Sequence, residues 1–136
     1  MVLGAVLSVV MLTQELSARE AMIQEAKALG ETLYKAQLCN AVDGLQIDDQ
    51  ARRVRIQDYL QRARAAGMTP QEFQHEIEST ALIEMAALAT ISGVDMDSRN
   101  PQQAFADAGL TDYVREACAE VLASHPDMFK PKSSAD

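Results

Sequence analysis

The sequence predicts an all-α fold, namely a single domain built as a bundle of about five helices, four long and one short. Of its 136 residues 48% are hydrophobic but only 4% are aromatic, with no Trp and six Gly. Ala, Leu, Met and Gln favour helix, whereas strands prefer aromatic and β-branched residues. A chain of this length typically forms one domain that buries about two thirds of its unfolded surface.

The first twelve residues, MVLGAVLSVVML, are apolar. They match the length of a secretory signal core and are too short for a transmembrane helix, which needs about 20 residues. However, the expected basic residue at the start of such a signal is absent, and a cleavage point after Ala18 would place the bulky Leu16 where a small residue is preferred. Residues 1–18 are therefore interpreted as a signal, an uncleaved anchor or the start of the first helix, and all three remain open.

A long helix is predicted from Thr13 to Val42, because this stretch has no Pro and only one glycine, Gly30. It can be continuous with the apolar N-terminus. The pair Asp43-Gly44 is typical of a helix end, and Asp48 or Asp49 can cap the next helix by accepting its free N–H groups.

The second helix is predicted from Asp49 to Ala66, with Gly67 after it. Five arginines border its apolar face. On one flank lie Arg53 and Arg64, and on the other Arg52, Arg55 and Arg62. Arginines in this position cover a helix contact or surround an interface. We therefore predict that Arg52, Arg55 and Arg62 bind a protein.

The third helix has the strongest start signal. Thr69 is placed as N-cap, Pro70 at the first helical position and Glu72 at the capping-box position, with Met68 and Phe73 spaced to pack together. The helix should end at Gly93. Its predicted inward face consists of Phe73, Ile77, Ala81, Met85 and Leu88. Because Leu82 and Ile83 lie outside this arc, the helix is apolar on nearly every side and is predicted to be central.

The pair Asn100-Pro101 should start a short helix that Gly109 ends, and Thr111 should cap the last helix. The inward face of that helix combines Val114, Ala117, Cys118, Val121 and Leu122. Pro126 should stop it. We assign residues 19–129 to the helical bundle and residues 130–136 to a disordered tail.

The two cysteines, Cys39 and Cys118, are predicted to form a disulfide if the protein is exported. The bridge would close a loop of about 80 residues and stabilise the fold by about 4 kcal/mol. Otherwise they are two buried thiols in a cytosolic protein. A catalytic role for Cys39 is disfavoured, because neither His75 nor His125 forms a recognisable Cys-His motif.

The formal net charge is −8, and all of the excess lies in the second half. Residues 1–66 carry eight basic and eight acidic side chains, whereas residues 67–136 carry four and twelve. Such a surface repels a phosphate backbone, so nucleic acid is not an expected partner. Basic proteins or metal cations fit better.

Two acidic features have alternative interpretations. The carboxylates of Asp43, Asp48 and Asp49 could bind a hard cation, but their spacing is not that of an EF-hand, and capping is favoured. Glu84 is the one charge within the apolar arc of the third helix. An ion pair with Arg53 or Arg64 is favoured over a role as acid or base.

The sequence contains no complete catalytic or nucleotide-binding motif, so we expect no enzymatic activity, no catalytic residue and no cofactor. The leading hypothesis is a protein that binds another protein, as inhibitors, immunity proteins, pilotins and assembly factors do. Export to a bacterial periplasm is expected, with the cytoplasm as the alternative. A metal-binding domain using the 43–49 turn is the alternative function, and membrane contact is expected only through residues 2–12.

Overall fold

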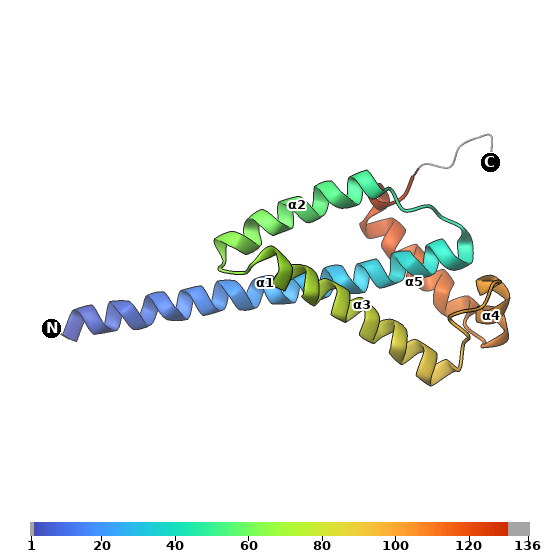
Figure 1. Cartoon of the computed structure of the whole chain (residues 1–136), viewed down its shortest axis with the longest axis horizontal. Helices are drawn as coiled ribbons and strands as arrows, with labels where there is room; N and C mark the ends of the chain where they lie inside the picture. Colours follow the sequence, from blue (N-terminus) through green and yellow to red (C-terminus); the bar gives the residue numbers. More distant parts are fainter. Residues whose placement is uncertain (1, 131–136) are drawn as a thin grey trace.

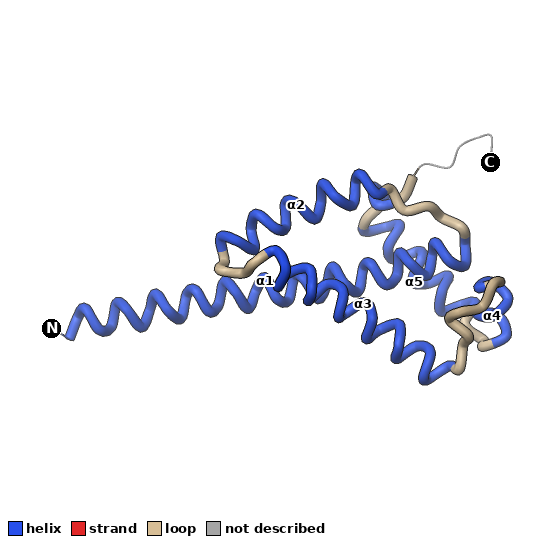
Figure 2. Tube along the Cα trace, viewed as in Figure 1, coloured by secondary structure: helices blue, strands red, loops and turns tan. Residues whose placement is uncertain are grey.

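One long helix organises the fold. In the computed structural model, which describes the backbone of residues 2–130 and the side chains of residues 17–130, five α-helices follow one another. They are α1 (Val2–Asp43), α2 (Asp49–Ala65), α3 (Pro70–Ser92), α4 (Pro101–Asp107) and α5 (Thr111–Ser124), followed by the 3-10 turn η1 (Pro126–Met128) (Figure 1). No strand forms within residues 2–130 (Figure 2), which confirms the all-α prediction.

α1 is continuous through both the apolar N-terminal segment and the predicted first helix. Its C-terminal part is covered by α3, α4 and α5, whereas its N-terminal part extends beyond the other helices (Figure 1). Signal and anchor both remain predictions, because the side chains of residues 2–16 lie outside the described part. Within the described residues, no helix is long and apolar enough to cross a membrane.

The predicted caps of α2 and α3 are confirmed. The Asp48 side chain accepts hydrogen bonds of 3.1 Å from the N–H groups of Gln50 and Ala51. Thr69 and Glu72 form the reciprocal capping box at the start of α3. These bonds satisfy N–H groups that the first helical turn leaves free.

The prediction that Thr111 caps α5 is wrong. Leu110 occupies the N-cap position and makes no side-chain capping bond. The Leu110 N–H instead donates to the Phe105 carbonyl at 2.9 Å, closing the end of α4. α5 therefore begins directly after α4, with Thr111 already in its first turn.

The core has two parts that share α1. One lies between α1, α2 and α3, and its buried side chains are Met22, Ala26, Leu29, Ala63, Met68, Phe73 and Ile77. The other lies between the C-terminal part of α1 and α3, α4, α5 and η1, and includes Leu38, Cys39, Phe105, Val114 and Val121. Gly30, itself buried, lies between the α1 residues of the two parts.

The segment after α5 pairs with the loop between α1 and α2. Ile47 and Phe129 form an isolated antiparallel bridge. The Asp48 N–H donates to the Met128 carbonyl at 2.7 Å, and the Lys130 N–H donates to the Gln46 carbonyl at 2.8 Å. Lys130, predicted as the first residue of a disordered tail, is therefore held by the fold, and residues 131–136 lie outside the described part.

The prediction that α3 is central is wrong. Its inward arc does pack on α1, with Phe73, Ile77 and Ala81 buried. However, Leu82 is 70% exposed and Ile83 is 67% exposed. The physical reason is that the chain turns at Gly93 and sends α4 and α5 back onto α1, so that within residues 17–130 nothing covers the outer side of α3.

Candidate protein-binding surfaces

The predicted disulfide is present and clamps α1 to α5. Cys39 and Cys118 are bonded, with their Cα atoms 5.4 Å apart and a sequence separation of 79. Both side chains are buried in the second part of the core. No free cysteine occurs among the described residues, so neither sulfur is available there as a nucleophile.

The three arginines predicted to bind a protein are paired within the chain. Arg55 donates to both carboxylate oxygens of Asp127, at 2.6 and 2.5 Å. Arg62 donates to both oxygens of Glu25, at 3.2 and 2.9 Å. These bonds tie α2 to η1 and to α1. Arg52 pairs within α2, 3.2 Å from Asp49. Their role in binding a partner stays a prediction.

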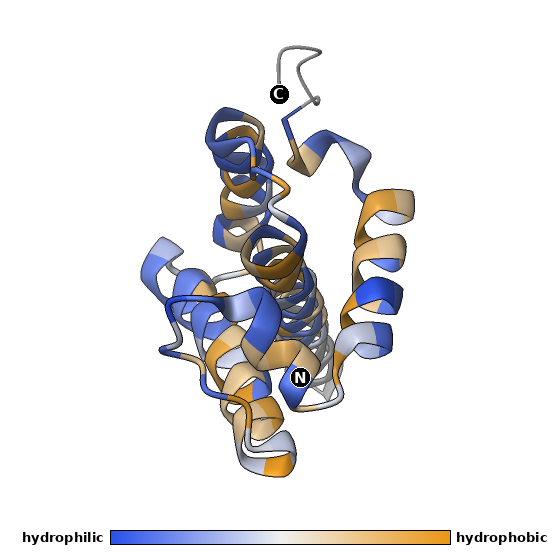
Figure 3. Cartoon of the chain, turned by 90° about the vertical axis from the view of Figure 1, so that its right-hand side faces the viewer, coloured by the Kyte–Doolittle hydropathy of each residue, from blue (hydrophilic) through white to orange (hydrophobic). Residues whose placement is uncertain are grey.

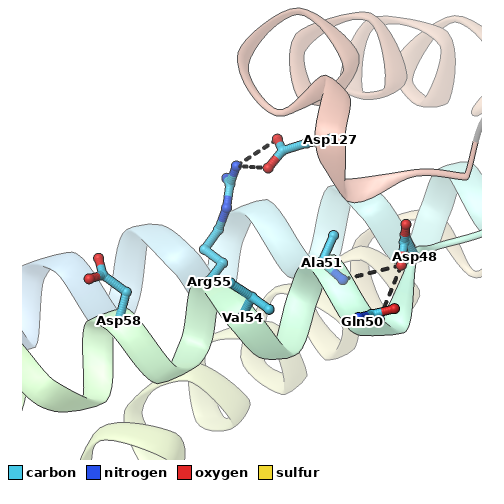
Figure 4. A pocket seen from close by; sticks show the side chains of 7 residues that line it. All are labelled: Asp48, Gln50, Ala51, Val54, Arg55, Asp58 and Asp127. Carbon is cyan, nitrogen blue, oxygen red and sulfur yellow. Dashed lines mark hydrogen bonds and ion pairs between the residues drawn. The ribbon is translucent and has the colours of Figure 1, made fainter.

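A pocket of about 490 Å³ lies where α2 meets η1 (Figure 4). Its charged lining residues are Asp48, Arg55, Asp58 and Asp127. The dashed lines in Figure 4 mark two hydrogen bonds from the Arg55 guanidinium to the Asp127 carboxylate, and the bonds by which Asp48 caps α2. Arg55, Asp127 and Asp48 are therefore already engaged in contacts within the chain.

The Arg55–Asp127 pair should make stability depend on pH. Hydrogen bonding from Arg55 holds the pKa of Asp127 below its ordinary value. Burial, helped by the charge of Arg55, lowers the pKa of His125. Depressed pKa values contribute stability above the unfolded-state values, about 6.5 for His and 3.9 for Asp, and this is lost as pH falls through the folded-state values.

We therefore expect acidification to destabilise the native protein more than an Arg55→Gln variant. Urea unfolding at a series of pH values measures this difference. NMR titration should show that the pKa of Asp127 and that of His125 both rise in the variant, because both lose the nearby positive charge. Unchanged pKa values in the variant would contradict the expectation.

A narrow groove of about 360 Å³ separates α2 from α3. Its apolar floor is formed by Leu33, Ile56, Leu60 and Ile77. Arg52, Arg53 and Glu78 are the charged residues of its rim. The sequence indicated arginines on both flanks of α2, and Arg52 and Arg53, one from each flank, border this groove.

The three carboxylates of the 43–49 turn do not form a cluster. Asp48 caps α2, Asp49 pairs with Arg52, and Asp43 is the last residue of α1. Within the described residues, no group of three or more His, Cys, Asp or Glu side chains could hold a metal ion. The geometry therefore favours the capping interpretation of this turn over the metal-binding one.

Glu84 does not form the predicted ion pair. Among residues 17–130 it is paired with neither Arg53 nor Arg64. Glu84 instead acts on Tyr34 of α1, whose hydroxyl lies 2.8 Å from that of Tyr113. Burial, the bond to Tyr113 and the charge of Glu84 all raise the pKa of Tyr34. The expectation was wrong because Glu84 lies near Tyr34 of α1 and not near the arginines of α2.

An exposed apolar surface covers the C-terminal half of α3. We define the α3 outer face as Leu82, Ile83, Ala86, Ala87, Thr90 and Ile91, all of them exposed. Ile91 is the most exposed large hydrophobic side chain described, at 87%. None of the six carries a charge. In Figure 3 the C-terminal end of α3, the lowest ribbon, shows large orange segments.

Sequence reasoning noticed Leu82 and Ile83 but interpreted them as a sign of burial. The available signal was their recurrence: residues 82, 86 and 90 form one row and residues 83, 87 and 91 another, which together make a stripe opposite the inward arc.

The fold and this surface define the class of the molecule as a disulfide-clamped helical bundle with an open apolar helix face. Comparisons with protein-family models, curated proteins and solved structures gave no match.

Proposed function

We propose that this chain is a non-catalytic protein that acts by binding another protein through the α3 outer face. The observation that carries the proposal is the exposure of three large aliphatic side chains, Leu82, Ile83 and Ile91, at 67–87% on one uncharged stripe. Single exposed hydrophobic residues are common, but a continuous apolar patch marks an interaction site. Inhibitors, immunity proteins, pilotins and assembly factors act in this way.

The rest of the chemistry supports a binding role over catalysis. Both cysteines are used in the disulfide. The α2 arginines Arg55 and Arg62 are paired with carboxylates of the same chain. These groups serve the fold, whereas the α3 outer face contributes nothing to it.

We propose that the protein works in an oxidising compartment such as a bacterial periplasm. The buried Cys39–Cys118 disulfide supports this, because disulfides persist in exported proteins and are rare in the cytosol. Alkylation of protein taken directly from its native compartment tests it. A fully alkylated chain would place the protein in a reducing compartment.

Site-specific photo-crosslinking in the native cells tests the binding surface. A photoreactive residue at Ala87 should give one dominant protein adduct, and the same residue at Ala123, exposed on α5, should not. Leu82→Asp should remove the adduct formed at position 87, because a carboxylate in the stripe must lose its hydration on binding. Equal yields at both positions, or no effect of Leu82→Asp, would contradict the proposed function.

A further inference from the structure

We propose that the α3 outer face binds an amphipathic helix whose apolar side is bordered by Lys and Arg. This inference rests on the proposed function, since it specifies the partner's chemistry for the same face. It is carried by two properties of the surface: the spacing of its apolar side chains, and the unpaired carboxylates that border it.

The spacing suits a helix. Leu82, Ala86 and Thr90 form one row along α3, and Ile83, Ala87 and Ile91 form the other. The ridges of a second helix fit between such rows, and the small alanines in the middle let the two backbones approach closely. The stripe spans ten residues, about 15 Å of helix, so it matches about three turns of a partner. Helices with one apolar side commonly dock in this way.

Carboxylates border the stripe. Glu76 lies two turns before Ile83 on the same side of α3, Glu78 lies one turn before Leu82, and Glu84 lies on the opposite flank from Glu78. Asp95 and Asp97 follow the end of α3. The border is not purely acidic, because His75 precedes Glu76 and Arg99 follows Asp97.

These five carboxylates form no ion pair, as is also true of Glu20, Glu31 and Glu116 elsewhere in the described part of the chain, so what distinguishes them is their position around the apolar stripe. Glu25, Glu72, Glu120 and Asp127 each pair with an arginine or lysine on another element. Within residues 17–130, no ion pair involves Glu76, Glu78, Glu84, Asp95 or Asp97. An apolar stripe with unpaired acids around it is complementary to an apolar stripe with basic residues around it.

A second copy of the chain fits this surface less well. The stripe itself could pair with its own copy, but the pairing would bring two acidic borders together in a protein of net charge −8. Like charges facing each other across an interface oppose binding. A basic partner removes this repulsion and gains attraction instead.

Two synthetic peptides test the proposal on the full-length oxidised protein. Both are 20-residue amphipathic helices with the same Leu/Ala side, one flanked by Lys and Arg and the other by Glu. Fluorescence anisotropy should show the basic peptide binding at least about tenfold more tightly, with an affinity that falls as salt is added. Replacing Glu76 and Glu84 together by Gln should flatten this salt dependence, whereas replacing Glu20 and Glu116, exposed elsewhere, should not.

Matched substitutions separate the α3 outer face from general attraction to an acidic protein. Ile83→Asp should weaken binding of the basic peptide by about tenfold or more, because the added carboxylate must be desolvated. Val54→Asp, at a 63% exposed position of α2, makes the same change in charge and should leave binding unaltered. Ile91→Asp repeats the test at the most exposed of the large hydrophobic side chains described, which is 87% exposed.

Equal affinity for both peptides, or equal effects of Ile83→Asp and Val54→Asp, would overturn this proposal. A dimer seen by light scattering and abolished by Ile83→Asp would show that a second copy occupies the face, and would also overturn it. If the peptides do not bind but crosslinking at position 87 is specific, only the basic-helix proposal fails. If that crosslinking is absent as well, the proposed function fails with it.

Discussion

Reduction of the Cys39–Cys118 disulfide is expected to destabilise the protein by about 4 kcal/mol, because the bridge closes a loop of about 80 residues in the unfolded chain. For a chain of this size the loss corresponds to a decrease in melting temperature of more than about 10 °C.

Thermal unfolding followed by circular dichroism, with and without dithiothreitol, measures this effect. The double variant Cys39→Ala with Cys118→Ala provides the control, since it should melt near the reduced protein and show no response to dithiothreitol. A melting temperature that is the same in both redox states would show that the disulfide does not stabilise the fold.

Gly30→Ala is expected to destabilise the protein by about 2 kcal/mol, although alanine is the better helix former by about 1 kcal/mol. A Cβ atom at Gly30 would lie 2.6 Å from the Ile77 carbonyl oxygen and 2.7 Å from the Thr80 Cβ. Because one of these atoms belongs to the backbone, α1 and α3 would have to move apart to admit the methyl group.

Close packing and helix propensity predict opposite signs for the change in the free energy of unfolding. If helix propensity decided the outcome, Gly30→Ala would raise the free energy of unfolding. Ala28→Gly, at an exposed position of the same helix, is the control and should lose only the propensity difference of about 1 kcal/mol. Urea unfolding of both variants measures the two free energies, and a stabilised Gly30→Ala protein would show that α1 and α3 are less closely packed.

Local signals in the sequence predicted most helix ends, although Thr111 does not cap α5. Asp48 and Thr69 cap the helices they were expected to cap, and Gly93 has the positive φ of 73° that a glycine at a helix end supplies. These features depend on residues within one turn of each other, so the sequence contains all the information they need. The Cys39–Cys118 pair was predictable for a different reason, because there were only two cysteines to join.

Features that depend on which helices become neighbours were not predictable. Glu84 was expected to face α2 but acts on Tyr34 of α1. α3 was expected to be central because of Leu82 and Ile83, yet both are exposed. Periodicity reports which residues share one side of a helix, but not whether another helix covers that side. For this reason the exposure of the α3 outer face, on which the proposed function depends, could not be predicted from the sequence.

The two parts of the core that meet at Gly30 are fastened by different chemistry. One is held covalently between α1 and α5. In the other, α2 buries only Ala63 completely, packs the partly buried Ile56, Tyr59 and Leu60 against the core, and adds the exposed Arg62–Glu25 pair to α1. Exposed ion pairs weaken as ionic strength rises, whereas a disulfide responds to the redox potential. A change in redox potential is therefore expected to act on the α1–α5 end of the bundle, whereas a change in ionic strength is expected to act on the ion pairs of α2.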